Sequence, residues 1–152
     1  MTDVCIRLLQ AKDIPMVLPL MWDLAVFEGY DHEFKVTEQE LLQRGFGPNA
    51  EFDCVTAWLG GEIIGYSVIV YTAFTYDLTL AATMKEFLIK EGFRGRSIGQ
   101  KLFEFTEAHC KQKGVKRLSW LVLEDNHKAQ PFYQKMGGEE SQQWLYYGKS
   151  LY

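Results

Sequence analysis

Residues 94–99 of this chain, Arg-Gly-Arg-Ser-Ile-Gly, are the feature that most restricts how it can fold. They follow the apolar run Phe87–Ile89 and precede apolar residues at helical spacing, Ile98, Leu102 and Phe105, so they indicate a tight turn from a strand into a helix. Such a turn directs unpaired backbone N–H groups and the positive end of the helix dipole at one point, which attracts phosphate. Glycine and arginine also serve turn geometry and solubility, so the segment alone leaves an ordinary turn and a phosphate site both open.

A second apolar run, Leu118–Leu123, follows this helix and indicates a strand buried on both faces and parallel to its neighbour. Strand, turn, helix and strand over residues 84–123 then make a βαβ crossover. In that arrangement the turn at residues 94–99 lies at the carboxyl end of a strand, where open α/β sheets bind ligands.

The N-terminal third predicts one strand and two helices. Residues 4–8 alternate as a half-buried strand does. Asp13 is a plausible N-cap for a helix that ends near Gly29, and Thr37–Glu40 has the pattern of a capping box that opens a short helix ending at residues 45–47. The acidic and aromatic connector between the two helices is most simply a solvated loop.

Strand character dominates the middle of the chain. Cys54–Leu59 and Ile63–Tyr71 are joined by Gly60-Gly61, which predicts a tight hairpin because both glycines can adopt positive φ. Met84–Ile89 predicts a further strand, and the helix after the turn at residues 94–99 runs to about Lys113.

The last third predicts a helix over about residues 127–136, capped by Asn126, and a final strand around Trp144–Leu151. The element order is therefore β-α-α-β-β-β-α-β-α-β, which predicts a single α/β domain over residues 1–152.

The composition limits the class of protein and of partner. A net charge of −4 and a pI near 5.4 disfavour nucleic acid and anionic membrane surfaces, and fit a cationic small substrate. Cys5, Cys54 and Cys110 are odd in number and widely spaced, so we expect buried or half-buried free thiols, a cytoplasmic protein and neither disulfides nor metal.

A second motif, Asn126 to Gly137 (N-H-K-A-Q-P-F-Y-Q-K-M-G), lies about 30 residues after the turn. With residues 94–99 at this spacing and in this strand order, the chain resembles the GNAT superfamily of acetyl-CoA-dependent N-acetyltransferases over its whole length. The turn matches the superfamily's pyrophosphate loop through Arg94 and Gly99, and the later segment matches its N-x-x-A-x-x-F-Y-x-K-x-G signature. The resemblance implies the GNAT fold, with a mixed, mostly antiparallel sheet flanked by helices.

The resemblance also implies where acetyl-CoA binds. The backbone of the strand would pair with the pantetheine arm, the turn would bind the pyrophosphate, and the later motif would complete the site; the residues are Phe87, Leu88, Ile89, Arg94, Gly95, Arg96, Ser97, Ile98, Gly99, Gln100, Asn126, Lys128, Ala129, Tyr133 and Lys135. Tyr133 would be the general acid that protonates the leaving thiolate, since a phenol is protonated at pH 7. Its alternative role is core packing with Phe132.

Other stretches are similar to the diamine (spermidine/spermine) and thialysine acetyltransferase branch, namely Phe27-Glu28, residues 37–47, Phe74–Asp77 and the aromatic tail. The branch implies a cationic amine substrate and a homodimer. Phe27, Glu28, Asp77 and Lys85 would contact the substrate. The candidates to accept the amine proton, directly or through water, are Glu28, Asp77 and Glu86.

Two residues depart from the family pattern. Ser97 stands where the pyrophosphate loop usually has glycine. Binding of the cofactor should survive this change in a weakened form. Lys85 stands where polyamine enzymes have a glutamate, and a charged lysine would repel a diamine. Glu86 is adjacent but would face the other side of the strand unless a bulge intervenes.

These departures keep other functions open. One alternative is a GNAT-fold module that binds acyl-CoA with little catalysis, and another is an acetyltransferase for protein lysines or aminoglycosides. A panel of amines assayed with acetyl-CoA separates them.

Overall fold

The computed structural model describes residues 3–152 and divides them into two units, one ending at Leu121 and one spanning Val122–Tyr152. Over these described residues, no helix is both long enough and apolar enough to cross a bilayer.

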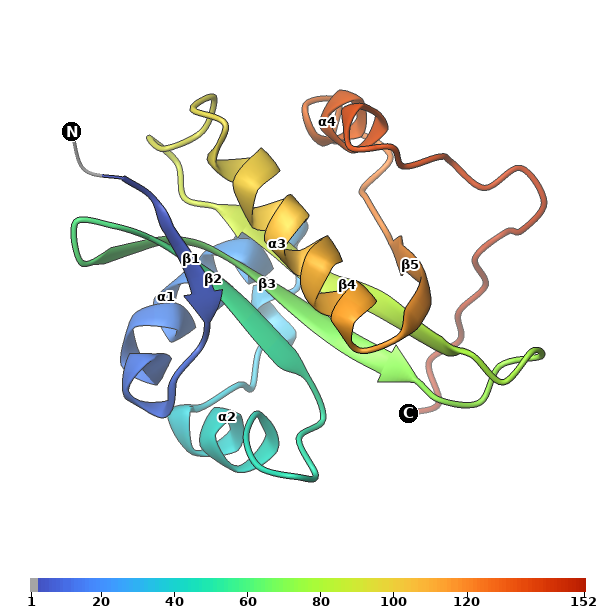
Figure 1. Ribbon diagram of the computed structural model, residues 1–152, viewed down its shortest axis with the longest axis horizontal. Helices are drawn as coiled ribbons and strands as arrows, with labels where there is room; N and C mark the ends of the chain where they lie inside the picture. The colour runs from blue at the N-terminus through green and yellow to red at the C-terminus, as the bar shows by residue number, and fades with distance from the viewer. Residues whose placement is uncertain (1–2) are drawn as a thin grey trace. The chain divides into compact units, whose positions relative to one another are not determined.

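The first unit is built on a sheet of five strands in the order β1-β2-β3-β4-β5 (Figure 1). Neighbouring strands are antiparallel except for β4 and β5, which are parallel, as the crossover predicts. The strands are β1 (Cys5–Leu8), β2 (Asp53–Leu59), β3 (Glu62–Thr72), β4 (Leu80–Ile89) and β5 (Val115–Trp120). Gly60 and Gly61 both have positive φ, so the predicted hairpin between β2 and β3 is confirmed.

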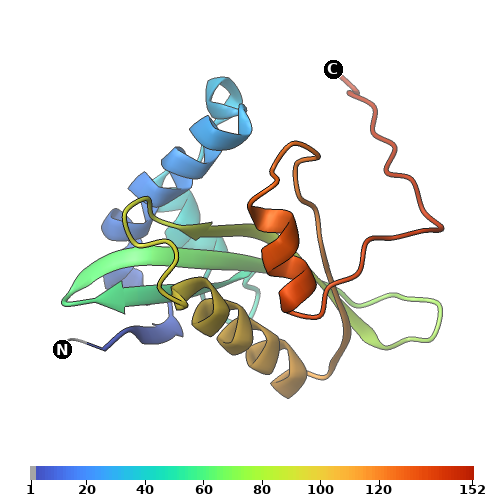
Figure 2. The same ribbon diagram turned by 90° about the horizontal axis from the view of Figure 1, so that it is seen from above.

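Helices cover the two faces of this sheet (Figure 2). Helices α1 (Ile14–Glu28) and α2 (Glu38–Arg44) lie on one face, and α3 (Ile98–Gln112) lies on the other. Short 3-10 turns, η1 (Ala11–Asp13) and η2 (Asp31–Glu33), precede α1 and follow it. Each face has its own buried apolar cluster, so the central strands β2 and β3 are buried on both sides.

Two predicted helix caps have different outcomes. Thr37 Oγ1 accepts a hydrogen bond from Glu40 N at 3.2 Å, which confirms Thr37 as the N-cap of α2. Asp13 makes no capping bond to α1. Its carboxylate is buried and pairs with Arg7 at 2.6 Å, because a buried charge needs a partner of opposite sign.

A β-bulge interrupts the pairing of β3 with β4. Val68 is opposite Glu86 and Ile69 is opposite Met84, so Lys85 is the extra residue. Ile69 belongs to the cluster on the α3 face and Val68 to the cluster on the α1–α2 face. Met84 and Glu86 therefore face opposite sides of the sheet, and Glu86 faces α1 and α2.

Strands β4 and β5 separate beyond the bulge. Their pairing ends at Met84 opposite Trp120, while β4 continues to Ile89. Within the described residues, the segment 85–89 thus has a strand neighbour on the β3 side alone.

Strand β5 differs from its prediction in position and burial. It begins three residues earlier than the expected Leu118–Leu123, and Lys116, Arg117 and Ser119 are exposed. The expectation that it is buried on both faces is therefore wrong. Cys5 is also exposed, contrary to prediction, whereas Cys54 and Cys110 are buried free thiols.

The second unit contains one short helix, α4 (Ala129–Lys135). Asn126 Oδ1 accepts a hydrogen bond from Ala129 N at 3.2 Å, in agreement with its predicted capping role. The final strand predicted around Trp144–Leu151 is wrong, because this segment has no ladder partner in the described part of the chain and Trp144, Tyr147 and Leu151 are each at least 80% exposed. Aromatic and β-branched residues favour a strand only where a neighbour is there to pair.

Candidate active site

The turn between β4 and α3 has a backbone that favours glycine. Gly92, Gly95 and Ser97 have φ of 93°, 77° and 62°, all in the left-handed region. These values are unfavourable for a residue with a Cβ, so the conformation at Ser97 is one that glycine adopts at a lower cost.

Backbone donors of this turn gather at the start of α3. The first helical hydrogen bond runs from Lys101 N to Ser97 O at 3.2 Å, so the N–H groups of Ile98, Gly99 and Gln100 lack an intrahelical acceptor. Together with the helix dipole, these three N–H groups suit an anion.

The two arginines of the turn have different surroundings. Arg94 Nε donates to Ile89 O at 2.9 Å and ties the turn back to the end of β4. The Arg96 guanidinium lies 5.6 Å from the centre of the Phe93 ring and is exposed. Both cations belong to the turn that precedes α3, so this turn could hold an anionic group such as a phosphate.

The open side of β4 offers a second set of backbone groups. Residues in an antiparallel strand direct their N–H and C=O groups alternately to either side. Along Phe87–Ile89 every second residue therefore presents its groups away from β3, where β5 has already separated. An extended pantetheine arm could pair there as an added strand would.

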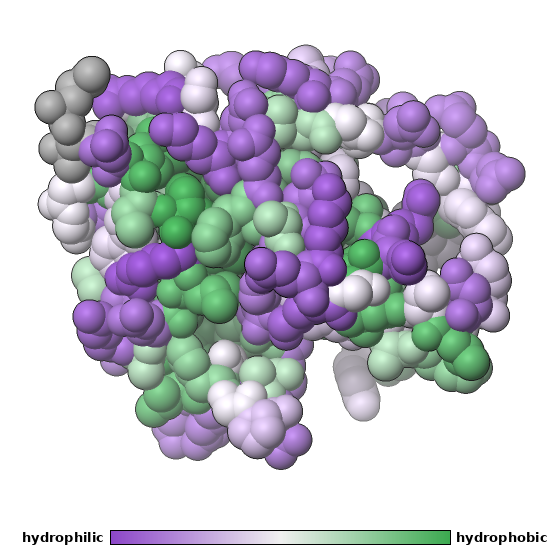
Figure 3. Space-filling model, viewed as in Figure 1, coloured by the Kyte–Doolittle hydropathy of each residue, from purple (hydrophilic) through white to green (hydrophobic). Residues whose placement is uncertain are grey.

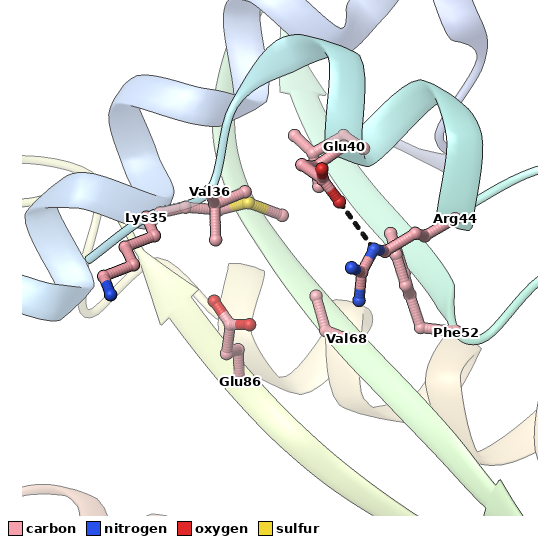
Figure 4. A pocket seen from close by; sticks show the side chains of 9 residues that line it. Lys35, Val36, Glu40, Arg44, Phe52, Val68 and Glu86 are labelled. Carbon is pink, nitrogen blue, oxygen red and sulfur yellow. Dashed lines mark hydrogen bonds and ion pairs between the residues drawn. The ribbon is translucent and has the colours of Figure 1, made fainter. Parts of the chain in front are cut away.

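A pocket of about 460 Å³ lies between the sheet and the helices α1 and α2 (Figure 4). Its wall is mostly apolar, with Glu86 rising into it from β4. The lining residues are Met21, Lys35, Val36, Glu40, Leu41, Arg44, Phe52, Val68 and Glu86.

Glu86 is held in this pocket by the bulge and by a buried tyrosine. Tyr66, which is fully buried, donates its hydroxyl to Glu86 Oε1 at 2.8 Å. Burial raises the pKa of Glu86, and the nearby charge of Glu28 raises it further. The hydrogen bond from Tyr66 acts in the opposite direction and lowers this pKa. Glu86 is thus a carboxylate that holds a proton more readily than an exposed glutamate does.

Glu28 and Tyr30 extend the acidic character near Glu86. Burial at the end of α1 raises the pKa of Glu28. Burial, the charge of Glu86 and the charge of Glu28 together raise the pKa of Tyr30 to about 12. These three groups therefore interact electrostatically, and a cation among them would be stabilised.

Two cations also line the pocket. Arg44 Nε binds Glu40 Oε2 at 2.6 Å, and Arg44 NH1 lies 3.6 Å from Glu51 Oε1. Lys35 extends from the segment before α2, and Figure 4 shows it and Arg44 on opposite sides of Glu86.

The other predicted substrate residues do not line this pocket. Phe27 is 55% exposed on α1, and Lys85 is exposed at the bulge. Asp77 is exposed between β3 and β4, where it accepts hydrogen bonds from Thr75 and Thr79. Substrate contact by Phe27, Asp77 and Lys85 stays a prediction.

Sequence reasoning missed four residues near Glu86, namely Tyr30, Lys35, Arg44 and Tyr66. The one available signal was Tyr66, a phenol within the apolar run Ile63–Tyr71, since a buried hydroxyl needs a hydrogen-bond partner.

The second unit carries the other predicted residues. Tyr133 lies on α4, half-buried, with its ring 5.4 Å from that of Phe132 in an edge-to-face arrangement. Lys128 and Lys135 are exposed at the two ends of α4.

Known proteins match this chain in sequence over most of its length. A model of the acetyltransferase (GNAT) family matches residues 15–138. The thialysine N-epsilon-acetyltransferase of Mus musculus is 26% identical over 156 residues, covering 95% of this chain and 91% of that protein. A putative ribosomal protein bS18-alanine N-acetyltransferase of Bacillus subtilis is 41% identical over 77 residues, covering 51% of this chain and 47% of that protein.

Solved structures support the fold. An aminoglycoside acetyltransferase from an uncultured soil metagenomic sample, in complex with sisomicin, has a TM-score of 0.81 at 21% identity and covers 98% of this chain and 97% of that chain. A second soil metagenomic aminoglycoside acetyltransferase has a TM-score of 0.83 at 13% identity and covers 99% of each.

The predicted fold class and family are thereby confirmed, since the family model spans most of the chain and the sheet is mixed with one parallel pair. The chain belongs to the acetyltransferase (GNAT) family and is an acetyl-CoA-dependent N-acetyltransferase.

Proposed function

We propose that this enzyme transfers acetyl from acetyl-CoA directly to a primary amine of a small cationic substrate bound in the pocket over Glu86. The observation that carries the proposal is the β-bulge at Lys85. This bulge directs the partly buried carboxylate of Glu86 toward an apolar pocket beside the open edge of β4. A net charge of −4 and the neighbouring Glu28 also suit a cation.

Glu86 would bind the ammonium group and then accept its proton, directly or through water. A primary amine with a pKa near 10.4 is almost wholly protonated at neutral pH and cannot attack a carbonyl in that form. The raised pKa of Glu86 makes it a better proton acceptor than an ordinary glutamate.

The remaining roles belong to the cofactor site. Acetyl-CoA supplies an activated acetyl group as a thioester. Its pyrophosphate would be bound by the turn at residues 94–99 and by the N–H groups of Ile98, Gly99 and Gln100. Its pantetheine arm would be bound by the open edge of Phe87–Ile89, which would leave one N–H group for the thioester oxygen. The amine nitrogen bonds to the acetyl carbon as the carbon–sulfur bond breaks, and Tyr133 would donate a proton to the departing sulfur.

The acceptor is the finer part of the proposal. The similarity to a mouse thialysine N-epsilon-acetyltransferase supports a diamine, polyamine or thialysine-like amino acid. We also propose that the enzyme is cytoplasmic and that it is a homodimer. Light scattering after gel filtration would test the dimer by its molar mass.

The test is a panel of amines assayed with acetyl-CoA, with free thiol measured as the product and the acetylated amine identified by mass. Diamines, polyamines, lysine analogues, aminoglycosides and a lysine-containing peptide form the panel. The proposal expects turnover with the small aliphatic amines. Tight acetyl-CoA binding without turnover on any amine would instead favour an acyl-CoA-binding module, and turnover on the peptide or the aminoglycosides alone would move the acceptor to those classes.

A further inference from the structure

Tyr66 is fully buried, yet its side chain carries a polar group. It belongs to the apolar cluster on the α1–α2 face of the sheet, where a phenylalanine would supply the same ring. A buried hydroxyl without a hydrogen-bond partner is costly, and the partner of Tyr66 is Glu86 Oε1 at 2.8 Å. The hydroxyl therefore serves the surroundings of Glu86 and is not needed to fill the core.

The register of the sheet explains this contact. Tyr66 is opposite Leu88, and Val68 is opposite Glu86, so Tyr66 and Glu86 are diagonal neighbours on β3 and β4. Diagonal neighbours on one face of an antiparallel pair lie about 7–8 Å apart, a distance that a long aromatic side chain can span. Both residues belong to central strands, which hold a side chain more precisely than a loop does.

The two oxygens of the Glu86 carboxylate have different surroundings. Oε1 accepts the hydrogen bond from Tyr66, whereas Oε2 accepts none from the residues that the structure describes. Within that same part of the chain, no fully buried side-chain oxygen lacks a hydrogen-bond partner. Oε2 is therefore not fully buried, and it is open to the pocket that Glu86 lines (Figure 4).

From this geometry we propose that Tyr66 is a positioning residue for the acetyl transfer. Its hydroxyl fixes Oε1, so that Oε2 of Glu86 binds the ammonium group and takes its proton. The proposal rests on the proposed function and adds to it the accepting oxygen and the residue that orients it. The N–H bond of the ammonium breaks as the Oε2–H bond forms, and Tyr66 keeps its own proton.

Tyr66 stays a hydrogen-bond donor because burial and the charge of Glu86 raise the pKa of its phenol. A donor to the charged form of a carboxylate favours that form, so the Tyr66 hydroxyl lowers the pKa of Glu86 against the effect of burial.

Other titratable and charged groups also act on Glu86. The charge of Glu28 raises the pKa of Glu86, and the charge of Lys85 lowers it. The further groups near Glu86, from the other elements packed against it, are Tyr30, Lys35, Glu40, Arg44 and Cys54. Among the described residues, Tyr66 alone donates a hydrogen bond to Glu86, so we expect its removal to change the proton affinity of this carboxylate.

The test is Tyr66→Phe, assayed by thiol release with one amine over a range of pH. Without its donor the carboxylate should hold a proton more readily, so the acid limb of kcat/KM should move to higher pH. On the acid side of this limb, kcat/KM should fall by roughly tenfold, the value for one hydrogen bond to a charged group, and the loss should shrink as the pH rises.

Tyr71→Phe is the matched control. Tyr71 lies on the same strand and donates its hydroxyl to another carboxylate, Asp53 Oδ2, at 2.6 Å on the α3 side of the sheet. The control removes the same atom and the same kind of bond from β3, and it should leave the acid limb where wild type has it.

Replacement of Tyr66 by 3-fluorotyrosine provides a second variant, in case Tyr66→Phe does not fold. Fluorine withdraws electrons from the ring and makes the phenol a stronger donor, while the hydrogen bond to Glu86 is kept. The acid limb should then move to lower pH, opposite to its movement in Tyr66→Phe.

The outcomes separate this inference from the proposed function. A wild-type pH profile in folded Tyr66→Phe, a loss of the same size at every pH, or no downward movement of the acid limb with 3-fluorotyrosine would overturn the role of Tyr66. Each of these results would leave the acetyl transfer at Glu86 standing. No thiol release by wild type with any amine would overturn the proposed function, and the inference with it.

Discussion

Glu86 shows at the level of one residue how function and stability can oppose each other. Its carboxylate is removed from water in an apolar pocket, and the hydrogen bond that it accepts from Tyr66 does not cancel the effect of burial on its pKa. A group whose pKa is raised in the folded state stabilises the fold when protonated, and that stability is lost as the pH rises through the folded pKa.

The substitution Glu86→Gln should therefore increase the free energy of unfolding at pH 7, since an amide of similar size carries no buried charge. The gain should disappear as the pH falls below 4.5, the ordinary pKa of a glutamate, where wild-type Glu86 is protonated in both states. Urea unfolding at several pH values measures this difference. Glu33→Gln, at an exposed residue, is the control, and a loss of stability in Glu86→Gln at pH 7 would refute the account of Glu86 as a buried charge.

Ser97 makes a second prediction at the residue scale. Its φ of 62° is unfavourable for a residue with a Cβ. Ser97→Gly should therefore raise the free energy of unfolding by about 0.5–1 kcal/mol, because the relief of backbone strain outweighs the greater conformational freedom of glycine in the unfolded chain.

The matched substitution in the same turn is Gly95→Ala. A Cβ at Gly95 would meet no atom within 4 Å, so its φ of 77° is the sole obstacle and the free energy of unfolding should fall. Thermal unfolding compares the two variants, and equal shifts of the same sign would contradict the account of this turn.

At the scale of elements, the bulge in β4 determines which of Lys85 and Glu86 faces the pocket. Because Lys85 is the extra residue, Glu86 occupies the place that follows Met84 in a regular strand. Glu86 therefore faces α1 and α2, and the exposed Lys85 is left outside the ladder.

A variant that lacks Lys85 should consequently fold, and it should keep its acetyltransferase activity within about tenfold. A variant that lacks Thr83, which is paired with Val70 in the same strand, should lose activity, since its removal turns neighbouring side chains to the wrong face. Circular dichroism and thiol release distinguish the two. Equal damage from both deletions would show that Lys85 is not the extra residue.

Asp53 joins three elements on the α3 side of the sheet. Its Oδ2 accepts from Tyr71 Oη at 2.6 Å at the end of β3, and it lies 2.8 Å from His109 Nε2 and 2.9 Å from Lys113 Nζ at the end of α3. Burial alone would raise the pKa of Asp53, but bonds from Lys113, Tyr71 and His109 outweigh it and lower the pKa to about 2.

Asp53→Asn should then cost roughly 2 kcal/mol of stability at pH 7. A depressed pKa contributes stability above the ordinary value of 3.8 and loses it as the pH falls toward about 2, so the cost should shrink between pH 7 and pH 3. Denaturant unfolding at both values checks this, and a cost independent of pH would contradict it. Tyr71→Phe, which removes one donor, should cost about 1 kcal/mol.

Across the whole molecule, the sequence predicted most of what local periodicity and spaced motifs encode, although the strand expected over Leu118–Leu123 begins at Val115 and is partly exposed. Apolar spacing located the helices that became α1 and α3, the Gly-Gly pair located the hairpin, and the two motifs identified the family. Where the outcome depended on a partner far away in sequence, prediction failed or stayed open. Alternation along β4 could not show that Lys85 bulges, and the composition of Trp144–Leu151 could not show whether a strand neighbour exists.

The pocket itself was the least predictable feature. Lys35 and Arg44 come from the segment around α2, and Tyr66 and Glu86 come from two central strands, with no shared motif or spacing. Their meeting is a result of tertiary packing alone. Glu86 was the exception, because the family resemblance named it as a candidate to accept the amine proton.

Tyr133, the proposed general acid, lies on α4 in the second unit. Tyr133→Phe should reduce turnover by about tenfold or more while the circular dichroism spectrum and the stability are kept, because only the hydroxyl is removed. Unchanged turnover would remove Tyr133 from the role of general acid.

The most direct test of the account is the pH dependence of kcat/KM for one amine that the enzyme acetylates. It is measured by thiol release for wild type and for Glu86→Gln. The account predicts that wild-type activity falls on the acid side as Glu86 is protonated, with a midpoint above 4.5, and that Glu86→Gln is slower by about 100-fold at pH 7 and lacks this acid limb. A Glu86→Gln enzyme with the rate and pH profile of wild type would contradict the claim that Glu86 binds and deprotonates the amine.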